Sequence, residues 1–379
     1  MSSDVGGDGP RFGVEEEFLV VDPETRAVVP GSEAALRQAR DRLGARVGGE
    51  ITKFQVESRT DPCRTLEELY TQLAEARAVL ATSAAHAGLR IVASGSPVLG
   101  NVVSPPLTEG ARQARGDATF RGLHDEASIC AVQVHVELPD RERALMVSNH
   151  LRPYLPRLIA LTANSPYWAE HDTGYASWRT MTWHRWPVAG PPPYFTSAKH
   201  YDAIIATLQE TGALVDAGTI FWDIRPSVHL PTLELRVSDV PITAEESALF
   251  AALVRALVLA SLPAVDAGER GPIIPPEMMR VAYWRAARDG MAGHGVELST
   301  GHLVPAATLA QGMLQVARPF LAEHGDLDRV AGWLRRVIEG GDGATRQRRM
   351  AARSGRLIDV VDDLIARTAP ESRGQAKSL

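Results

Sequence analysis

Four short segments of this chain alternate between apolar and polar residues, and this alternation strongly constrains the fold. They cover residues 12–21, 53–60, 131–138 and 231–239. Successive side chains of a β-strand point to opposite faces of a sheet, so each segment predicts a strand with one apolar and one polar face. Such alternation is typical of antiparallel strands that pack on one side only.

The polar faces carry functional groups where solvated strands usually carry Thr, Lys and Ser. In the first segment Glu15 and Glu17 share a face, and two like charges repel each other unless a cation neutralises them. A solvated strand edge is the alternative interpretation of that segment. The other three polar faces carry Gln55, Glu57 and Arg59; Gln133, His135 and Glu137; and Thr232, Glu234, Arg236 and Ser238.

These residue types point to metal and phosphate chemistry. Carboxylates with an imidazole are ligands for hard cations such as Mg²⁺ or Mn²⁺. Arginines hold phosphate or carboxylate groups with two parallel hydrogen bonds. Gathered on one concave sheet face, they are what phosphoryl transfer from a nucleotide requires. The sequence contains neither a Gly-x-x-x-x-Gly-Lys-Ser/Thr loop nor a Gly-x-Gly-x-x-Gly motif after a strand, so neither common nucleotide-binding fold is indicated.

Length and charge exclude several classes of protein. The 379 residues suffice for one large domain or two ordinary ones, and the net charge of −6 provides no basic field for nucleic acid or an anionic membrane. We expect no run to approach the roughly 18 apolar residues of a membrane span, and no secretory signal is visible. Cys63 and Cys130 form neither a zinc motif nor a disulfide framework. These features predict a cytoplasmic protein.

The order of patterns predicts a single α+β catalytic domain over residues 11–369, with flexible ends at 1–10 and 370–379. Its sheet-rich part covers 11–240, and the helical part covers 243–369. Between residues 164 and 195 lies a long irregular region, rich in Trp, Tyr and Pro, that contains Arg179 and Arg185. Loops of this length are usually functional, so the region is either a substrate lid or a packed loop covering the sheet.

Several motifs, in order from residue 12 to about 290, resemble those of the type 2 glutamate–cysteine ligases, also called carboxylate–amine ligases. Two lie on predicted strands: Gly-Val-Glu-Glu-Glu-Phe at 13–18 and Val-His-Val at 134–136. The others are Leu-Thr-Ala-Asn-Ser-Pro-Tyr-Trp at 161–168, Asp-Thr-Gly at 172–174, Arg-Trp-Pro-Val-Ala-Gly-Pro-Pro-Pro at 185–193, Trp-Asp-Ile-Arg-Pro-Ser at 222–227, Thr-Leu-Glu-Leu-Arg-Val at 232–237 and Trp-Arg-Ala-Ala-Arg at 284–288.

The resemblance implies a glutamine-synthetase-like fold, in which helices flank an antiparallel sheet that forms a funnel. It also implies an ATP-dependent reaction that joins a carboxylate, typically the γ-carboxylate of glutamate, to an amine such as cysteine through an acyl phosphate. Five residues on the polar faces are the candidate ligands for Mg²⁺ or Mn²⁺: Glu15, Glu17, Glu57, His135 and Glu234. The candidate catalytic residues are Arg236 and Glu57, and the candidate ligands for nucleotide or substrate anions are Arg179, Arg185 and Arg225.

Four positions depart from the family pattern. Gln133 and Glu137 replace the first His and the Gly of His-Val-His-Val-Gly, Ser96 lies in Gly-Ser-Pro in place of Gly-Thr-His-Pro, and Val281 begins Val-Ala-Tyr-Trp in place of Glu-Asn-Arg-Trp. These departures predict an altered acid or amine partner. We expect small-molecule substrates and a homo-oligomer. The alternatives are a metal-dependent phosphotransferase on the same fold and a catalytically silent binding protein.

Overall fold

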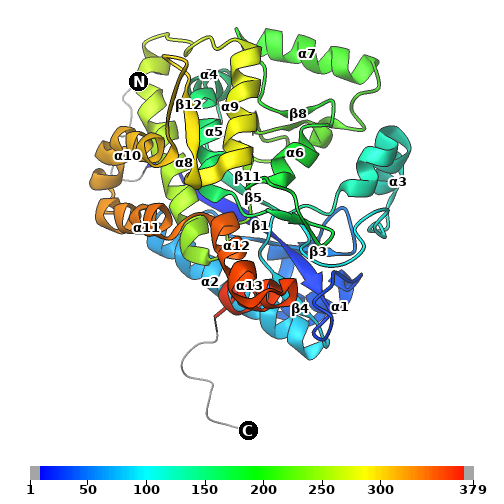
Figure 1. The fold of residues 1–379 in the computed structure, drawn as a ribbon. Coiled ribbons are helices and arrows are strands. Elements are labelled where there is room, and N and C mark those ends of the chain that lie inside the picture. The colour runs from blue at the N-terminus through cyan, green and yellow to red at the C-terminus, as the bar shows by residue number, and fades with distance from the viewer. Residues whose placement is uncertain (1–8, 371–379) are drawn as a thin grey trace.

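The computed structural model describes residues 9–370. Of the flexible ends predicted at 1–10 and 370–379, residues 1–8 and 371–379 lie outside the described residues. The seven strands of the main sheet are arranged in the order β10-β11-β5-β1-β3-β2, with β4 also paired to β1, and every pair is antiparallel (Figure 1). Their bounds are Phe12–Val21 for β1, Val47–Gly49 for β2, Gln55–Arg59 for β3, Arg90–Val92 for β4, Ala131–Glu137 for β5, Ile224–Pro226 for β10 and Thr232–Asp239 for β11.

The register of the sheet brings the predicted polar faces onto one side. Glu15 lies opposite both Arg59 and Gln133. Residues paired across antiparallel strands point to the same face, so the polar faces that the alternation predicted for these strands meet on one side of the sheet. Other pairs across the sheet are Glu17 with Glu57, His135 with Glu234, and Glu234 with Arg225.

The prediction for Ser238 is wrong. An irregularity in the pairing of β11 with β5, between Leu235 and Ser238, places Ser238 opposite Val132 on the apolar face. A β-bulge of this kind inserts an extra residue and reverses the alternation beyond it. Period-two reasoning cannot see such an insertion, because the sequence alternates through it without a break.

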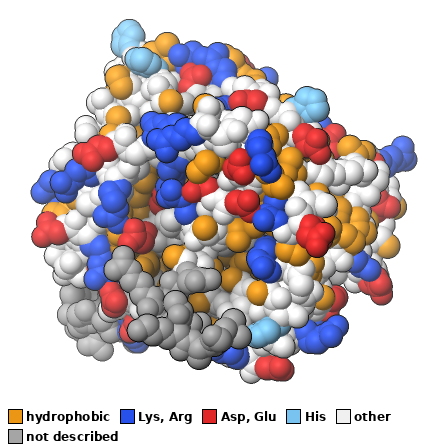
Figure 2. Space-filling view, turned by 60° about the horizontal axis from the view of Figure 1, so that its bottom comes forward, with side chains coloured by type: hydrophobic (Ala, Val, Ile, Leu, Met, Phe, Trp, Pro, Cys, Tyr) orange, Lys and Arg blue, Asp and Glu red, His pale blue; other side chains and the backbone are white. Residues whose placement is uncertain are grey.

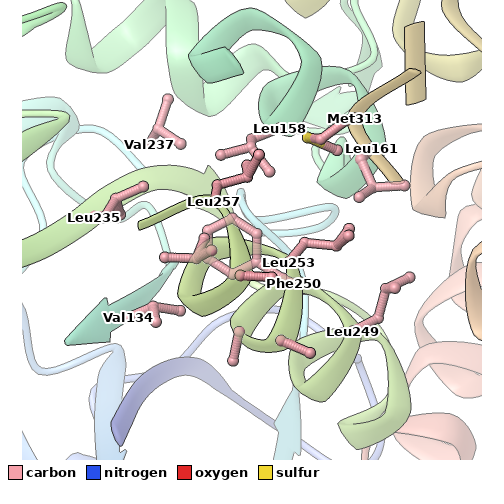
Figure 3. Packing of buried hydrophobic residues seen from close by; sticks show 14 of the residues in the cluster. Val134, Leu158, Leu161, Leu235, Val237, Leu249, Phe250, Leu253, Leu257 and Met313 are labelled. Atoms are coloured by element: carbon pink, nitrogen blue, oxygen red, sulfur yellow. The ribbon is translucent and has the colours of Figure 1, made fainter. Parts of the chain in front are cut away.

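The apolar face of the sheet packs on a core built around helix α8, Ala244–Asp266. Figure 3 shows Val134, Leu235 and Val237 of the strands facing Phe250 and its neighbours on this helix. Further members of the cluster come from α2, Leu66–His86, from α5, Leu155–Thr162, and from α10, Ala306–Glu323.

Helix α8 is apolar on almost all sides. Its length and hydropathy would allow it to cross a membrane, contrary to the expectation from the sequence, but 67% of its apolar window is buried inside the protein. A helix that is apolar all round is typical of a protein core as well as of a membrane. Burial against the sheet therefore accounts for its composition.

The middle Glu of the first motif has a structural role. Glu16 points away from its neighbours into the core, where it is 0% exposed. The guanidinium of Arg77 donates to both of its oxygens, over 3.0 and 2.5 Å, and to the carbonyls of Pro241, Ile242 and Thr368. This pair ties β1 to α2 and to the start of the helical region.

Replacing Arg77 with methionine should lower the free energy of unfolding by about 3 kcal/mol, because Glu16 would remain buried without its cation. Denaturant unfolding of the single variant and of the double variant Arg77→Met/Glu16→Leu measures the effect. The double variant should recover part of the loss. Wild-type stability in Arg77→Met alone would contradict this role.

Residues 164–195 are more ordered than the sequence predicted. The segment contains β6, Tyr167–Trp168; β7, His171–Asp172; α6, Trp178–Trp183; and β8, Ala189–Gly190, which pairs with β9, Phe221–Trp222. The prediction of a wholly irregular region is therefore wrong. Because Ser177 caps α6 by accepting from the Thr180 amide, a helix forms even among closely spaced aromatic residues.

The remaining helices surround these layers. Helix α3 lies on the opposite side of the molecule from α10 and α11 (Figure 1), and acidic and basic side chains are interspersed over the face that Figure 2 shows. The other bounds are α1, Ser32–Leu43; α3, Ala111–Phe120; α4, Arg141–Leu151; α7, Ala198–Glu210; α9, Pro276–Asp289; α11, Leu327–Gly340; α12, Gly343–Ser354; α13, Leu357–Thr368; and the hairpin β12, His294–Glu297, with β13, His302–Pro305.

Candidate active site

The polar face of the sheet forms the floor of a cavity of about 570 Å³. Walls rise from α3, from the short turn η4, Ala217–Thr219, and from the loop at residues 227–230. All five predicted metal ligands line this cavity, together with Arg179, Arg225 and Arg236. The structure therefore brings together candidates that lie up to about 220 residues apart in the sequence.

One end of the floor holds an acidic cluster. Ligand oxygens of Glu17, Glu50 and Glu57 all lie within 4.8 Å of one another. Burial raises the pKa of Glu17 to about 8 and that of Glu57 well above its usual range, and the charge of Glu50 adds to both shifts. Burial and the Glu15 carboxylate also raise the pKa of Glu50. Three carboxyls that disfavour ionisation together are a group that could hold a divalent ion, because the charge of the ion would reverse this cost.

Glu50 was missed by the sequence reasoning. It follows strand β2, which has only three residues and two glycines, so no alternation reveals its direction. The signal that could have found it is the pairing of β2 with β3, which places Gly48 opposite Glu57. That pairing is a long-range property that a single short strand does not encode.

Hydrogen bonds fix the orientation of Glu17. Its Oε2 accepts from the amide of Ala131 over 2.7 Å, and its Oε1 accepts from Nε2 of Gln133 over 3.1 Å. The Oε1 atom of Gln133 in turn accepts from Arg236 over 2.5 Å. The side-chain amide of Gln133 thus connects Glu17 of the acidic cluster to Arg236.

Contacts at both ring nitrogens orient His135, which the sequence predicted to be a metal ligand. Its Nδ1 lies 2.9 Å from Oγ1 of Thr232, and its Nε2 lies 3.6 Å from Oε1 of Glu15. When Nδ1 donates to Thr232, Nε2 keeps the free lone pair that a metal takes. Arg59 is ion-paired with Glu57 of the acidic cluster, and its Nε lies 3.7 Å from Oε1 of Glu15. Arg59 therefore lies between the acidic cluster and the pair formed by Glu15 and His135.

Glu234 differs from the other carboxylates because two arginines neutralise it. Arg225 donates to both of its oxygens, over 3.0 and 3.1 Å, and Arg236 donates to Oε1 over 2.5 Å. Burial opposes the charge, but the two guanidiniums outweigh it and lower the pKa of Glu234 to about 2. Arg225 also donates to the carbonyls of Gly218 and Ile220, so the geometry favours a supporting role over anion binding.

Two other arginines retain donors that no described residue accepts. Nε of Arg179 and Nε of Arg236 are both buried without a hydrogen-bond partner among residues 9–370. The Arg179 guanidinium lies against the backbone of β11, because it donates to the Arg236 carbonyl over 3.1 Å. Arg185 lies elsewhere: it pairs with Glu126 and is not among the residues that line the cavity. Of the three arginines predicted to bind anions, Arg179 and Arg225 therefore line the cavity and Arg185 does not. Arg179 keeps an Nε–H without an acceptor among residues 9–370, whereas Arg225 is paired with Glu234.

Comparison with known proteins identifies the family. The family model described as "Glutamate-cysteine ligase family 2" matches residues 11–368. The chain belongs to this family. A Mycolicibacterium smegmatis protein named "Putative glutamate--cysteine ligase 2-3" is 43% identical over 368 residues, covering 96% of this chain and 99% of the relative. A Saccharopolyspora erythraea relative, named as a 2-1 member, is 41% identical over 362 residues and 95% of each chain.

Solved structures share the fold. A glutamate–cysteine ligase from Francisella tularensis, solved in complex with AMP, superimposes with a TM-score of 0.71 at 12% identity and covers 96% of this chain and 89% of that chain. A bifunctional glutathione synthetase from Pasteurella multocida gives a TM-score of 0.71 at 14% identity, and the match covers 52% of that longer chain. The protein is an ATP-dependent ligase with the glutamine-synthetase-like fold, as the motifs predicted.

The family motif at 161–168 connects β11 of the main sheet to α6, two elements that contribute residues to the cavity. Asp239, at the end of β11, accepts from the Asn164 amide and from the hydroxyls of Ser165 and Ser177, each over 2.7 to 2.8 Å. Oγ of Ser165 also accepts from the amide of Arg179 over 3.0 Å. The motif therefore fixes the start of α6 against β11, and with it the position of Arg179.

The metal-free ligase should lose thermal stability as the pH rises through about 8. Glu17 has a folded pKa of about 8 against an ordinary value of 4.5, so the folded state keeps a proton that the unfolded state has lost, stability falls as the pH rises between these two values, and the loss is complete above pH 8. Melting temperatures from pH 6 to 9, measured with EDTA and with MgCl₂, test this expectation. Mg²⁺ should stabilise most at high pH, and Glu17→Gln should flatten the profile. An EDTA profile without any pH dependence would contradict the assignment.

Proposed function

We propose that the enzyme joins the carboxylate of an amino acid, with the γ-carboxylate of glutamate as the first candidate, to a small-molecule amine through an acyl phosphate. One observation carries the proposal: the cavity is lined by a cluster of three carboxyls and by Arg179 and Arg236, whose buried Nε–H groups have no acceptor among residues 9–370. Such a cavity can hold both a metal-bound triphosphate and an acid.

The residues present fit divalent cations. Glu17, Glu50 and Glu57 would hold one Mg²⁺, or Mn²⁺, and Glu15 with Nε2 of His135 would hold a second. Because Glu57 is one of the three carboxyls that would hold the first ion, we propose that it contributes to catalysis as a ligand of that ion. Glu234 already carries the charge of two arginines, which favours a role in orienting Arg236. When bound, the cations would neutralise the triphosphate and the charge that develops on the transferred phosphoryl group.

The proposed reaction has two steps. A carboxylate oxygen of the acid attacks the γ-phosphorus of ATP, and the bond to the β-phosphate oxygen breaks, which gives an acyl phosphate and ADP. The amine nitrogen then attacks the acyl carbon, loses a proton, and displaces inorganic phosphate. Arg236 and Arg179 would donate to the oxygens that gain charge, because preorganised donors in a buried site stabilise such charge strongly.

Most departures from the family pattern lie away from the cavity. Val281 is on an exposed face of α9. Glu137 pairs with Arg11 over 3.0 Å at the end of β5, and Ser96 is buried, donating to the Tyr167 carbonyl over 2.6 Å. Gln133 is the one departure among these four that lines the cavity. An altered substrate would therefore depend on Gln133, between Glu17 and Arg236.

Amine-dependent ADP release tests the proposal. The assay contains Mg²⁺, glutamate and a panel of amino acids and amines that includes cysteine, with Glu15→Gln as the control. Release that requires an amine and disappears in the control supports the ligase reaction and names the amine. ADP release together with a persistent phosphorylated product, and no amide, would favour the phosphotransferase. No release with any acid and amine of the panel would contradict the proposal.

The surroundings of the reaction are part of the same proposal. Cys63 and Cys130 are both free and buried, which suits a reducing compartment, so we propose a cytoplasmic location. A homo-oligomer is also proposed. Light scattering of the purified protein would test the second point, because a monomer has a mass of 41.0 kDa.

A further inference from the structure

Helix α6 contributes two residues with N–H donors to the cavity lining. Arg179 and Trp183 are four residues apart on this helix, and both line the cavity. Side chains four residues apart lie on the same helical face. Trp183 is 5% exposed, and its indole Nε1–H, like Nε of Arg179, is buried without a hydrogen-bond partner among the described residues.

The ring of Phe221 connects this face of α6 to Arg236. Its centroid lies 4.8 Å from the indole of Trp183 and 5.8 Å from Cζ of Arg236. Arg179, Trp183 and Arg236 therefore all line the cavity, and each has a buried N–H group without a partner among residues 9–370. A buried donor without an acceptor costs about 1 to 3 kcal/mol, so three of them in one cavity point to a ligand that supplies the acceptors.

We propose that Trp183 is a further binding residue, whose indole N–H donates to an oxyanion held by Arg179 and Arg236. This inference rests on the proposed function, and it adds a neutral third donor to the two guanidiniums. The oxyanion is either the carboxylate of the acid substrate or a phosphate oxygen of ATP. Both offer several acceptor lone pairs to N–H donors.

The chain provides a matched control for this role. Nε1 of Trp178 is also buried without a partner in residues 9–370, but Trp178 is not among the residues that line the cavity. It packs against Tyr175 with ring centroids 5.5 Å apart. Phenylalanine at either position keeps an aromatic ring and removes the N–H. If both tryptophans had only a structural role, the two substitutions would have similar effects on ligand binding. If Trp183 binds the ligand, only Trp183→Phe should weaken binding.

The test is equilibrium binding of three probes by calorimetry: glutamate, Mg·ATP and inorganic phosphate. Trp183→Phe should raise the dissociation constant of at least one probe roughly ten- to hundredfold, as expected for a lost hydrogen bond to a charged group. Weaker glutamate binding assigns the donor to the carboxylate, and weaker Mg·ATP binding assigns it to the nucleotide. Trp178→Phe should leave all three constants within about twofold.

A second measurement covers the case in which Trp183→Phe does not fold. In the wild type, one of the seven tryptophan indole N–H resonances should shift when the probe is added. Unchanged binding in a folded Trp183→Phe, no indole shift, or no wild-type binding of any probe would overturn the inference. Failure of the proposed function is distinguishable, because a wild type that binds phosphate through Trp183 but releases no ADP would keep this site and lose the reaction.

Discussion

Replacing Arg236 with lysine should reduce amine-dependent ADP release by roughly a thousandfold, with a smaller effect on KM. The guanidinium is almost fully buried and donates to Glu234 and Gln133, and its Nε–H has no acceptor in the part of the chain that the structure describes, so in the proposed reaction it would serve a ligand. Lysine keeps the charge, but it cannot reproduce the planar fork that spans two acceptors and still points a third donor at the reacting group. Loss of one preorganised donor to developing charge typically costs a hundred- to a thousandfold in kcat.

The measurement is steady-state kinetics of wild type and Arg236→Lys at matched Mg²⁺ and ATP. Arg143→Lys is the control, since Arg143 pairs with Asp266 over 2.6 Å on the surface and does not line the cavity. It should stay within about twofold of wild type. Arg236→Lys with wild-type kcat would show that this guanidinium does not face the reacting phosphate or carboxylate.

Replacing Glu57 with glutamine should have opposite effects on activity and stability. Glu57 is 2% exposed in a cluster with Glu17 and Glu50, and burial with its acidic neighbours raises its pKa. Removing one acid relieves the repulsion in the metal-free protein, so the melting temperature in EDTA should rise by about 2 °C. The same change removes a cation ligand, so Mg²⁺ affinity should fall roughly ten- to hundredfold and ligase activity with it.

Differential scanning calorimetry with and without Mg²⁺ measures the melting temperature and the stabilisation by Mg²⁺, and amine-dependent ADP release measures the activity of the same variant. Glu33→Gln is the control, because Glu33 is an exposed carboxylate that pairs with Arg40 over 2.8 Å. A Glu57→Gln protein that is less stable than wild type in EDTA would contradict the account of the cluster. Unchanged activity would separate Glu57 from the metal, whatever its effect on stability.

The floor of the site could be predicted from the sequence because it is made of alternating strands. Period-two patterns are local, and they identified Glu15, Glu17, Glu57, His135 and Glu234 as members of one face. Their partners could not be predicted in the same way. Glu50 follows a strand too short to show a period, and the bulge in β11 reversed the direction of Ser238 without interrupting the alternation.

The roles of the arginines also required three dimensions. All of them are capable of binding anions, and only the contacts distinguish them. Arg225 pairs with Glu234, Arg185 pairs outside the cavity, and Arg179 and Arg236 each keep an Nε–H that no residue of the described range 9–370 accepts. The same holds for Trp183, which the sequence placed in an irregular aromatic region and the structure places on α6, one turn after Arg179.

The most direct test of the central claim follows the oxygen atoms of the acid. Glutamate labelled with ¹⁸O in its side-chain carboxylate is incubated with ATP, Mg²⁺ and the amine that supports ADP release, and the inorganic phosphate is analysed by mass spectrometry. If the carboxylate is phosphorylated before the amine attacks, one ¹⁸O atom per amide bond passes to the phosphate. Phosphate free of label, formed together with an amide, would contradict activation of the acid as an acyl phosphate.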